Sequence, residues 1–135
     1  MPPADDDEVA EGGYYTTPPM QRVAGTGSVA NFVIHRNGFG SIHFKTEVDL
    51  TSIPSLSALR ELVKIERGLV TVYPDESKKP DPGNGLNVPA KIALENVKKP
   101  ADFDMDEFLE NLKTKPDKEF LSYESETWTY QVEHF

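Results

Sequence analysis

The chain has 135 residues, a mass of 15.1 kDa, no cysteine and a formal net charge of −9. This length suits one domain, and the missing cysteine excludes disulfides, a thiolate nucleophile and a zinc finger. The acidic charge disfavours non-specific binding to nucleic acid or anionic lipid, and neither a signal peptide nor an apolar run of roughly 18–20 residues is present, so we expect a soluble, intracellular protein without membrane insertion.

The negative charge is concentrated at the N-terminus. Residues 1–12 hold five of the 23 acidic residues and none of the 14 basic ones, which leaves −4 on residues 13–135. Blocks of like charge with proline are usually solvated and disordered. We therefore predict a disordered acidic leader over residues 1–12 and a single domain over residues 13–135, with an acidic docking arm as the alternative for the leader.

The first two predicted strands form a hairpin. Residues 28–36 and 39–45 are rich in β-branched and aromatic side chains and flank Asn37-Gly38, which suits a type I′ turn. In the second of these strands Ile42 and Phe44 alternate with polar residues. The alternation indicates a sheet that is covered on one face only.

A second hairpin follows over residues 62–66 and 69–73, with Gly68 in its turn. Residues 52–60 contain Pro54 and three serines, so they are left open as a short helix or a loop. Residues 74–89 have the proline and glycine content of a long loop, and residues 90–97 resume strand alternation.

A helix is predicted over about residues 104–115. Asp104 and Glu107 have the spacing of a capping box, and Phe103 can pack against Phe108 as a hydrophobic staple. Met105, Phe108, Leu109 and Leu112 form an apolar stripe at helical spacing, and Pro116 follows.

The last segment, residues 127–135, alternates like an interior or well-paired strand, and places His134 on the apolar face with Trp128 and Tyr130. Together these elements predict an α+β fold, mainly antiparallel β-sheet with hairpins, flanked by one well-defined helix and short helical turns.

The sequence contains no phosphate-binding loop, nucleophile elbow, dinucleotide fingerprint or metal-spaced histidine pair, so no cofactor or metal is expected. His35 and His43 lie in the first hairpin and are interpreted as polar strand residues or as partners in local hydrogen bonds. His134 stands apart because it precedes the final Phe135.

Several motifs occur in an order that resembles a known family. They are the segments GYYTTP at residues 13–18, NFVI at 31–34, GFGSI at 38–42, VTVY at 70–73, GNGLN at 83–87, and the final His134-Phe135. The chain is similar over residues 13–135 to the nucleoporin autopeptidase family, the autoproteolytic domain at the C-terminus of GLFG-repeat nucleoporins. The resemblance implies cleavage after Phe135, before a serine or threonine, and makes Phe135 a cleavage-generated terminus.

The chemistry of such a cleavage needs a base and a site for the oxyanion. A hydroxyl on the residue after Phe135 can attack the Phe135 carbonyl in an N→O acyl shift, and His134 is the natural general base. The GNGLN segment can supply oxyanion support from Asn87 and close backbone approach at Gly85. The given chain lacks the nucleophile, so we interpret it as the product of a single-turnover, serine-type autopeptidase.

The resemblance further implies a location in the nucleus, at the nuclear pore complex. There the domain anchors an FG-repeat nucleoporin and supports transport of protein and mRNA. Expected partners are a β-propeller nucleoporin and the N-terminal segment released by cleavage. The alternative is a protein-interaction module that never cleaves itself. An RNA-binding domain would need a basic face, for which Lys78-Lys79 and Lys98-Lys99 are the candidates.

Overall fold

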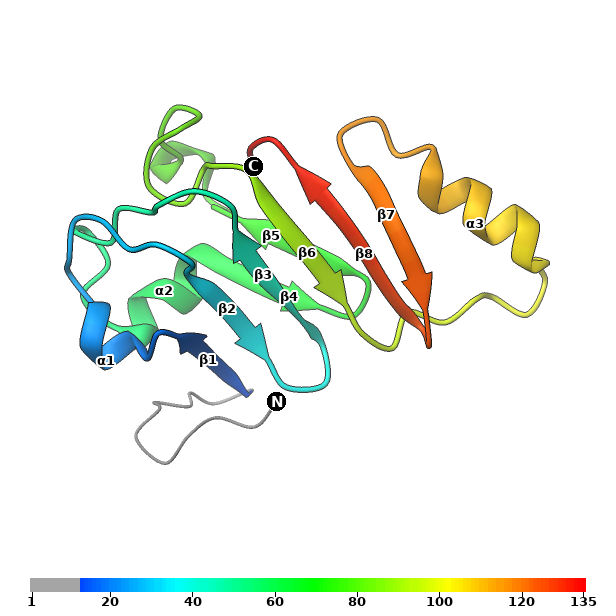
Figure 1. Ribbon diagram of the computed structural model, residues 1–135, viewed down its shortest axis with the longest axis horizontal. Coiled ribbons are helices and arrows are strands. Elements are labelled where there is room, and N and C mark those ends of the chain that lie inside the picture. Colours follow the sequence, from blue (N-terminus) through cyan, green and yellow to red (C-terminus); the bar gives the residue numbers. More distant parts are fainter. Residues whose placement is uncertain (1–12) are drawn as a thin grey trace.

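A computed structural model describes residues 13–135, and its centre is a six-stranded antiparallel sheet (Figure 1). The predicted leader, residues 1–12, lies outside the described residues. In spatial order the strands are β1 (Tyr14–Thr17), β2 (Val33–Arg36), β3 (Gly40–Phe44), β6 (Ala90–Leu94), β8 (Thr127–Val132) and β7 (Glu119–Glu124). The mainly antiparallel α+β class predicted from the sequence is confirmed.

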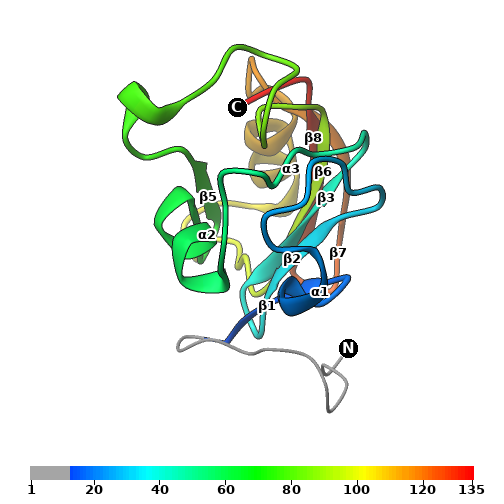
Figure 2. The same ribbon diagram turned by 90° about the vertical axis from the view of Figure 1, so that its left-hand side faces the viewer.

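The remaining elements lie around this sheet, and those of residues 56–72 form a second layer over one of its faces. They are the helices α1 (Met20–Val23), α2 (Leu56–Leu62) and α3 (Met105–Lys113), the 3-10 helix η1 (Glu76–Lys78), and a separate hairpin of β4 (Val63–Glu66) and β5 (Leu69–Val72). Figure 2 shows α2 and β5 on one side of the six-stranded sheet. Figure 1 shows α3 beyond β7, at the far end of the molecule.

The core lies between the sheet and this second layer. Ile42, Ile92 and Tyr130 point from neighbouring strands into it and are at most 2% exposed, whereas His43 and Lys91 are exposed on the opposite face. The predicted one-sided coverage of the sheet is therefore confirmed. The apolar face of the sheet is covered by residues of α2 and of the β4–β5 hairpin because each of those elements also has an apolar side to bury.

The first hairpin forms as predicted, but its turn differs. Arg36 pairs with Gly40, so the loop has three residues, and Gly38 alone among them has a positive φ, of 79°. A type I′ turn needs two consecutive positive φ values, so that prediction is wrong. Gly40 follows with a φ of 152°, and a Cβ there would lie 2.2 Å from the carbonyl oxygen of Ala93 on β6.

The segment predicted as a short helix or a loop contains α2. Ser55 caps the helix by accepting a hydrogen bond from Ala58 N at 3.1 Å. The helix runs directly into β4, and Gly68 has a φ of 73° in the β4–β5 turn, as the second predicted hairpin requires.

The predicted helix is α3, and Asp104 is its N-cap as expected, because its carboxylate accepts from Glu107 N at 2.8 Å. The apolar stripe is narrower than predicted, since Phe108 is buried but Met105 is 46% exposed. The reason is that α3 packs mainly against β7, the strand at the edge of the sheet, where the rings of Phe108 and Tyr123 meet edge to face at 5.1 Å. The helix ends at Lys113, two residues before the predicted limit.

The last predicted strand is β8, and it lies inside the sheet between β6 and β7, as expected. It ends at Val132, the partner of Ala90 in β6. Pro89 precedes Ala90 and has no N–H to extend the ladder. His134 therefore lies beyond the strand and is exposed, which corrects its predicted place on the buried face.

Within residues 13–135, no helix is long and apolar enough to cross a bilayer. The same residues contain no group of three or more histidine or carboxylate side chains suited to a metal ion.

Candidate functional site

The C-terminal end of the chain lies beside the loop that joins β5 and β6, and both ribbon views show this proximity (Figures 1 and 2). The backbone N–H of Phe135 donates to Oδ1 of Asn87 in that loop, at 2.5 Å. The ring of Phe135 also packs edge to face on Phe44 of β3, with centroids 6.2 Å apart. One polar and one aromatic contact therefore hold the final residue in place.

Asn87 is 1% exposed, and both ends of its carboxamide are used. Its Nδ2 donates to the carbonyl oxygen of Pro80 at 2.9 Å, which leaves Oδ1 turned toward Phe135. The backbone around it forms a compact turn, with Asn87 N donating to Asn84 O at 2.9 Å and Gly83 N donating to Asn87 O at 2.6 Å. A buried amide whose nitrogen and oxygen are both hydrogen-bonded has one preferred orientation, so this loop fixes the position of the Phe135 amide.

The contact joins two residues that the sequence predicted for the site, but through the oxygen of Asn87. Oxyanion support from Asn87 would need its N–H donors, and Nδ2 bonds to Pro80 in this structure. The observed arrangement positions the C-terminal segment, and a role toward the oxyanion stays a prediction.

Gly85, the other loop residue predicted for the site, has a φ of 56°. A Cβ at this position would lie 2.8 Å from the hydroxyl oxygen of Tyr73. That hydroxyl accepts a hydrogen bond from Leu86 N at 3.1 Å. Glycine thus permits the close approach of a tyrosine that was not predicted as a site residue. Nothing in the sequence marks Tyr73 for this role, because its contact depends on how two distant segments meet.

His134 lies next to the acyl group of Phe135. Its Nδ1 is 3.4 Å from the Phe135 oxygen, and its other ring nitrogen makes no hydrogen bond with a described residue. The side chain is exposed to solvent. An imidazole in this position is close to the carbonyl at which an acyl transfer would take place.

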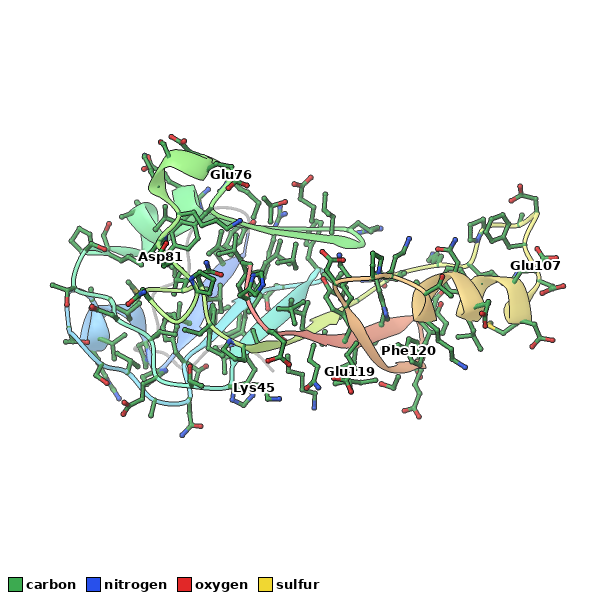
Figure 3. All side chains as sticks on the ribbon, turned by 90° about the horizontal axis from the view of Figure 1, so that it is seen from above. Lys45, Glu76, Asp81, Glu107, Glu119 and Phe120 are labelled. Carbon is green, nitrogen blue, oxygen red and sulfur yellow. The ribbon has the colours of Figure 1, made fainter. Side chains whose placement is uncertain are left out.

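A cleft of about 690 Å³ opens beside Phe135. It lies between β5, the end of β8 and the segment that leads into β7, and its lining includes His134, Thr71, Lys79, Lys118 and Tyr130. Figure 3 shows the molecule from above, with Asp81 toward one end, Glu119 nearer the middle and Glu107 of α3 at the opposite end. The cleft offers apolar walls and charges of both signs to a segment that continues from Phe135.

The two tyrosine hydroxyls near the site remain neutral over the physiological range. Burial raises the pKa of Tyr73, and the hydrogen bond from Leu86 opposes part of that rise. Burial also raises the pKa of Tyr130, with a smaller contribution from the Asp117 carboxylate. Burial disfavours the charged phenolate, so both groups act as neutral hydroxyls.

The other two histidines lie elsewhere in the sheet. The His35 ring stacks on Tyr15 with centroids 4.5 Å apart, and its Nε2 lies 3.1 Å from Thr17 Oγ1. His43 is exposed on β3. The structure brings neither of them to Phe135, in agreement with their interpretation as strand residues.

Comparison with known proteins finds a family match over nearly the whole chain. Residues 11–135 match the family described as Nup98-96 autopeptidase S59. Nucleoporin NUP145 of Chaetomium thermophilum is 34% identical over 143 residues, which cover 95% of this chain and 8% of that protein. NUP145 of Saccharomyces cerevisiae is 42% identical over 129 residues, covering 80% of this chain and 10% of that protein. The chain thus spans a tenth or less of these relatives.

Two solved structures share the fold. The first is a mutant of the Chaetomium thermophilum Nup145N APD, fused to Nup145C N. It has a TM-score of 0.82 and 35% sequence identity, and the alignment covers 93% of this chain and 96% of that chain. The second is a chain of the yeast heterotrimeric Nup82-Nup159-Nup116 nucleoporin complex. It has a TM-score of 0.81 and 25% sequence identity, and the alignment covers 93% of this chain and 98% of that chain.

Proposed function

The chain belongs to the Nup98-96 autopeptidase family of nuclear pore proteins, and from this premise we propose that a precursor extending beyond Phe135 cleaves itself after that residue. The cleaved domain then anchors an FG-repeat nucleoporin at the nuclear pore and supports transport of protein and mRNA.

The proposed reaction is an N→O acyl shift followed by hydrolysis. The hydroxyl oxygen of a serine or threonine after Phe135 attacks the Phe135 carbonyl carbon, and His134 accepts the hydroxyl proton. The C–N bond then breaks, His134 returns the proton to the leaving amine, and an ester joins the two segments. Water hydrolyses this ester to the Phe135 carboxylate and the free hydroxyl, so each chain reacts once.

The observation that carries this proposal is the contact between Asn87 and Phe135. A buried amide holds the N–H of the residue whose carbonyl would react, and the Phe135 ring is packed on Phe44. Restricting both the backbone and the side chain of the acyl residue supports an intramolecular attack, because the nucleophile belongs to the next residue. The His134 Nδ1 at 3.4 Å from the Phe135 oxygen supports proton transfer at the same place.

The proposed partners are a β-propeller nucleoporin and the N-terminal segment released by cleavage. Support comes from the structural similarity to a chain of the Nup82-Nup159-Nup116 complex and from the cleft that begins at Phe135. The open edge of a strand can also accept an extended segment through backbone hydrogen bonds.

The test is to extend the chain by serine and several further residues and to follow its intact mass with time. We expect first-order conversion, independent of protein concentration, to a fragment ending at Phe135. His134→Ala should slow the conversion by roughly 100-fold or more if His134 is the base. Replacing the added serine by alanine is the control that removes the nucleophile. A folded, extended chain that stays intact would overturn the proposal.

The second candidate is an interaction module that never cleaves itself, and the solvent exposure of His134 favours it, since an exposed base is less constrained. An extended chain that remains intact but still binds a nucleoporin partner would support this candidate.

A further inference from the structure

Tyr73 has a backbone conformation that is unusual for an aromatic residue. It follows the last residue of β5 and has a φ of 59°, in the left-handed region that bulky side chains rarely adopt. Its N–H donates to Leu62 O at 2.6 Å, so the turn is fixed by the end of α2. Such conformations cost of order 1–3 kcal/mol and persist where the surroundings impose them, often at functional sites.

The conformation delivers the Tyr73 side chain to the loop before β6. Tyr73 is 6% exposed, and its hydroxyl accepts the hydrogen bond from Leu86 N. The position of Gly85 confirms how close the approach is, since a Cβ there would lie within 2.8 Å of the hydroxyl oxygen. The hydroxyl therefore holds Leu86, the residue that directly precedes Asn87, and lies against Gly85.

Asn87 in turn holds Phe135. Its Oδ1 accepts from Phe135 N at 2.5 Å, and its Nδ2 is tied to Pro80 within the same loop. Leu86 is fully buried, so the backbone that links it to Asn87 has little room to shift. A continuous series of contacts thus runs from the end of β5, through Leu86 and Asn87, to the amide of Phe135.

We infer that Tyr73 is a positioning residue for self-cleavage: its hydroxyl fixes the loop that aims Asn87 at the Phe135 amide. This inference rests on the proposed function for its catalytic consequence, whereas the positioning itself is a property of the 135-residue chain. Tyr73 acts through Asn87 and touches none of the reacting atoms.

The matched control is Tyr14, whose buried hydroxyl accepts a hydrogen bond from Ile65 N at 3.0 Å and also donates one to Ile65 O at 3.4 Å. Tyr73→Phe and Tyr14→Phe each remove the acceptor of one backbone N–H and keep the ring. The first measurement is amide hydrogen exchange in the 135-residue chain, under conditions in which both variants are folded. We expect Tyr73→Phe to accelerate exchange at Phe135 by about tenfold, the scale of one lost hydrogen bond, and to leave the Ile65 amide unchanged.

Tyr14→Phe should give the reverse pattern: the Ile65 amide should exchange faster, and the exchange rate of the Phe135 amide should stay unchanged. This crossover separates positioning from a general loss of stability, which would accelerate both amides in both variants. Equal effects of the two variants on the Phe135 amide would overturn the inference.

The second measurement is the cleavage rate of the chain extended by serine. Tyr73→Phe should slow cleavage by about tenfold, and Tyr14→Phe should leave it within about twofold. In an Asn87→Ala background, Tyr73→Phe should have little further effect, because its influence passes through Asn87. Additive effects would contradict that route.

A second variant guards against a folding defect in Tyr73→Phe. Gly85→Ala keeps the tyrosine but pushes its hydroxyl away, and should accelerate Phe135 exchange in the same way. Gly68→Ala is its control, since Gly68 also has a positive φ, of 73°, with open space around it. If no extended chain cleaves but the exchange crossover appears, the proposed function fails and the positioning by Tyr73 stands. If cleavage occurs without the crossover, the inference fails and the proposed function stands.

Discussion

Gly40 shows how one missing side chain sets the spacing of the sheet. It lies on β3 with a φ of 152°, and a Cβ would meet backbone of β6, 2.2 Å from Ala93 O and 3.1 Å from Leu94 Cα. Neither atom can move without breaking the pairing of two interior strands. Glycine is therefore required here for a close approach as well as for its backbone conformation.

We predict that Gly40→Ala lowers the free energy of unfolding by about 3 kcal/mol or more. Gly38→Ala is the control, because Gly38 also has a positive φ but a Cβ added there would have no other atom within 4 Å. Its cost should be about 1–2 kcal/mol, from backbone strain alone. Urea unfolding followed by the single tryptophan, Trp128, measures both values, and equal losses for the two variants would contradict the steric argument.

Among individual residues, the sequence predicted part of the candidate site. Asn87, Gly85, His134 and Phe135 were selected from motifs that resemble the family, and the structure brings Asn87 and Phe135 into contact. Tyr73 was not selected, because neither its positive φ nor its contact with Leu86 follows from residue type or spacing. The predicted burial of His134 was wrong, since alternation continued past Val132 in the sequence but strand pairing did not.

Helix α3 illustrates what local signals can predict. Its start at Asp104 follows from capping chemistry, which depends on residues only three positions apart. Strand β7, by contrast, was not predicted. Its burial does not alternate cleanly, and a register irregularity lies between Phe120 and Ser122. The order of the strands in the sheet could not be predicted from the sequence either. The pairing of β3 with β6, for example, joins residues separated by several other elements and a long loop.

We predict that Asp104→Ala lowers the free energy of unfolding by about 1 kcal/mol, because Glu107 N loses its side-chain acceptor. Asp102→Ala makes the same change of charge at an exposed residue just before the helix, and should cost only a few tenths of a kcal/mol. Thermal unfolding of the two variants at equal ionic strength makes the comparison. A loss for Asp102→Ala as large as that for Asp104→Ala would show that charge, and not the cap, is responsible.

The core of the whole molecule contains Tyr73 and Tyr130, with Tyr123 partly buried against it, and this links the stability of the fold to alkaline pH. Burial raises the pKa of Tyr73, Tyr123 and Tyr130 above 10, the ordinary value that they regain on unfolding. Their contribution to stability is fully present below pH 10 and is lost as pH rises from there toward the folded-state pKa, because the unfolded chain then binds fewer protons than the folded one.

We predict that the free energy of unfolding falls above pH 10 by up to about 1.4 kcal/mol per pH unit for each of two core tyrosines, Tyr73 and Tyr130. Tyr130→Phe should reduce this slope, because Tyr130 has the largest shift of the three and is 2% exposed. Urea unfolding of the wild type and the variant at several pH values between about 8 and 11.5 gives the two slopes. Identical slopes would show that Tyr130 ionises with little cost in the folded state.

The contact between Asn87 and Phe135 joins residues 48 positions apart, and β8 reaches it only after pairing with β6. The proposed cleavage site is therefore absent from an unfolded or half-folded chain. Newly synthesised precursors would be cut after they acquire their tertiary structure and not before. The yield of cleaved product in a cell would then be a measure of the fraction of chains that have folded. A destabilising substitution anywhere in the core would raise the amount of uncut precursor.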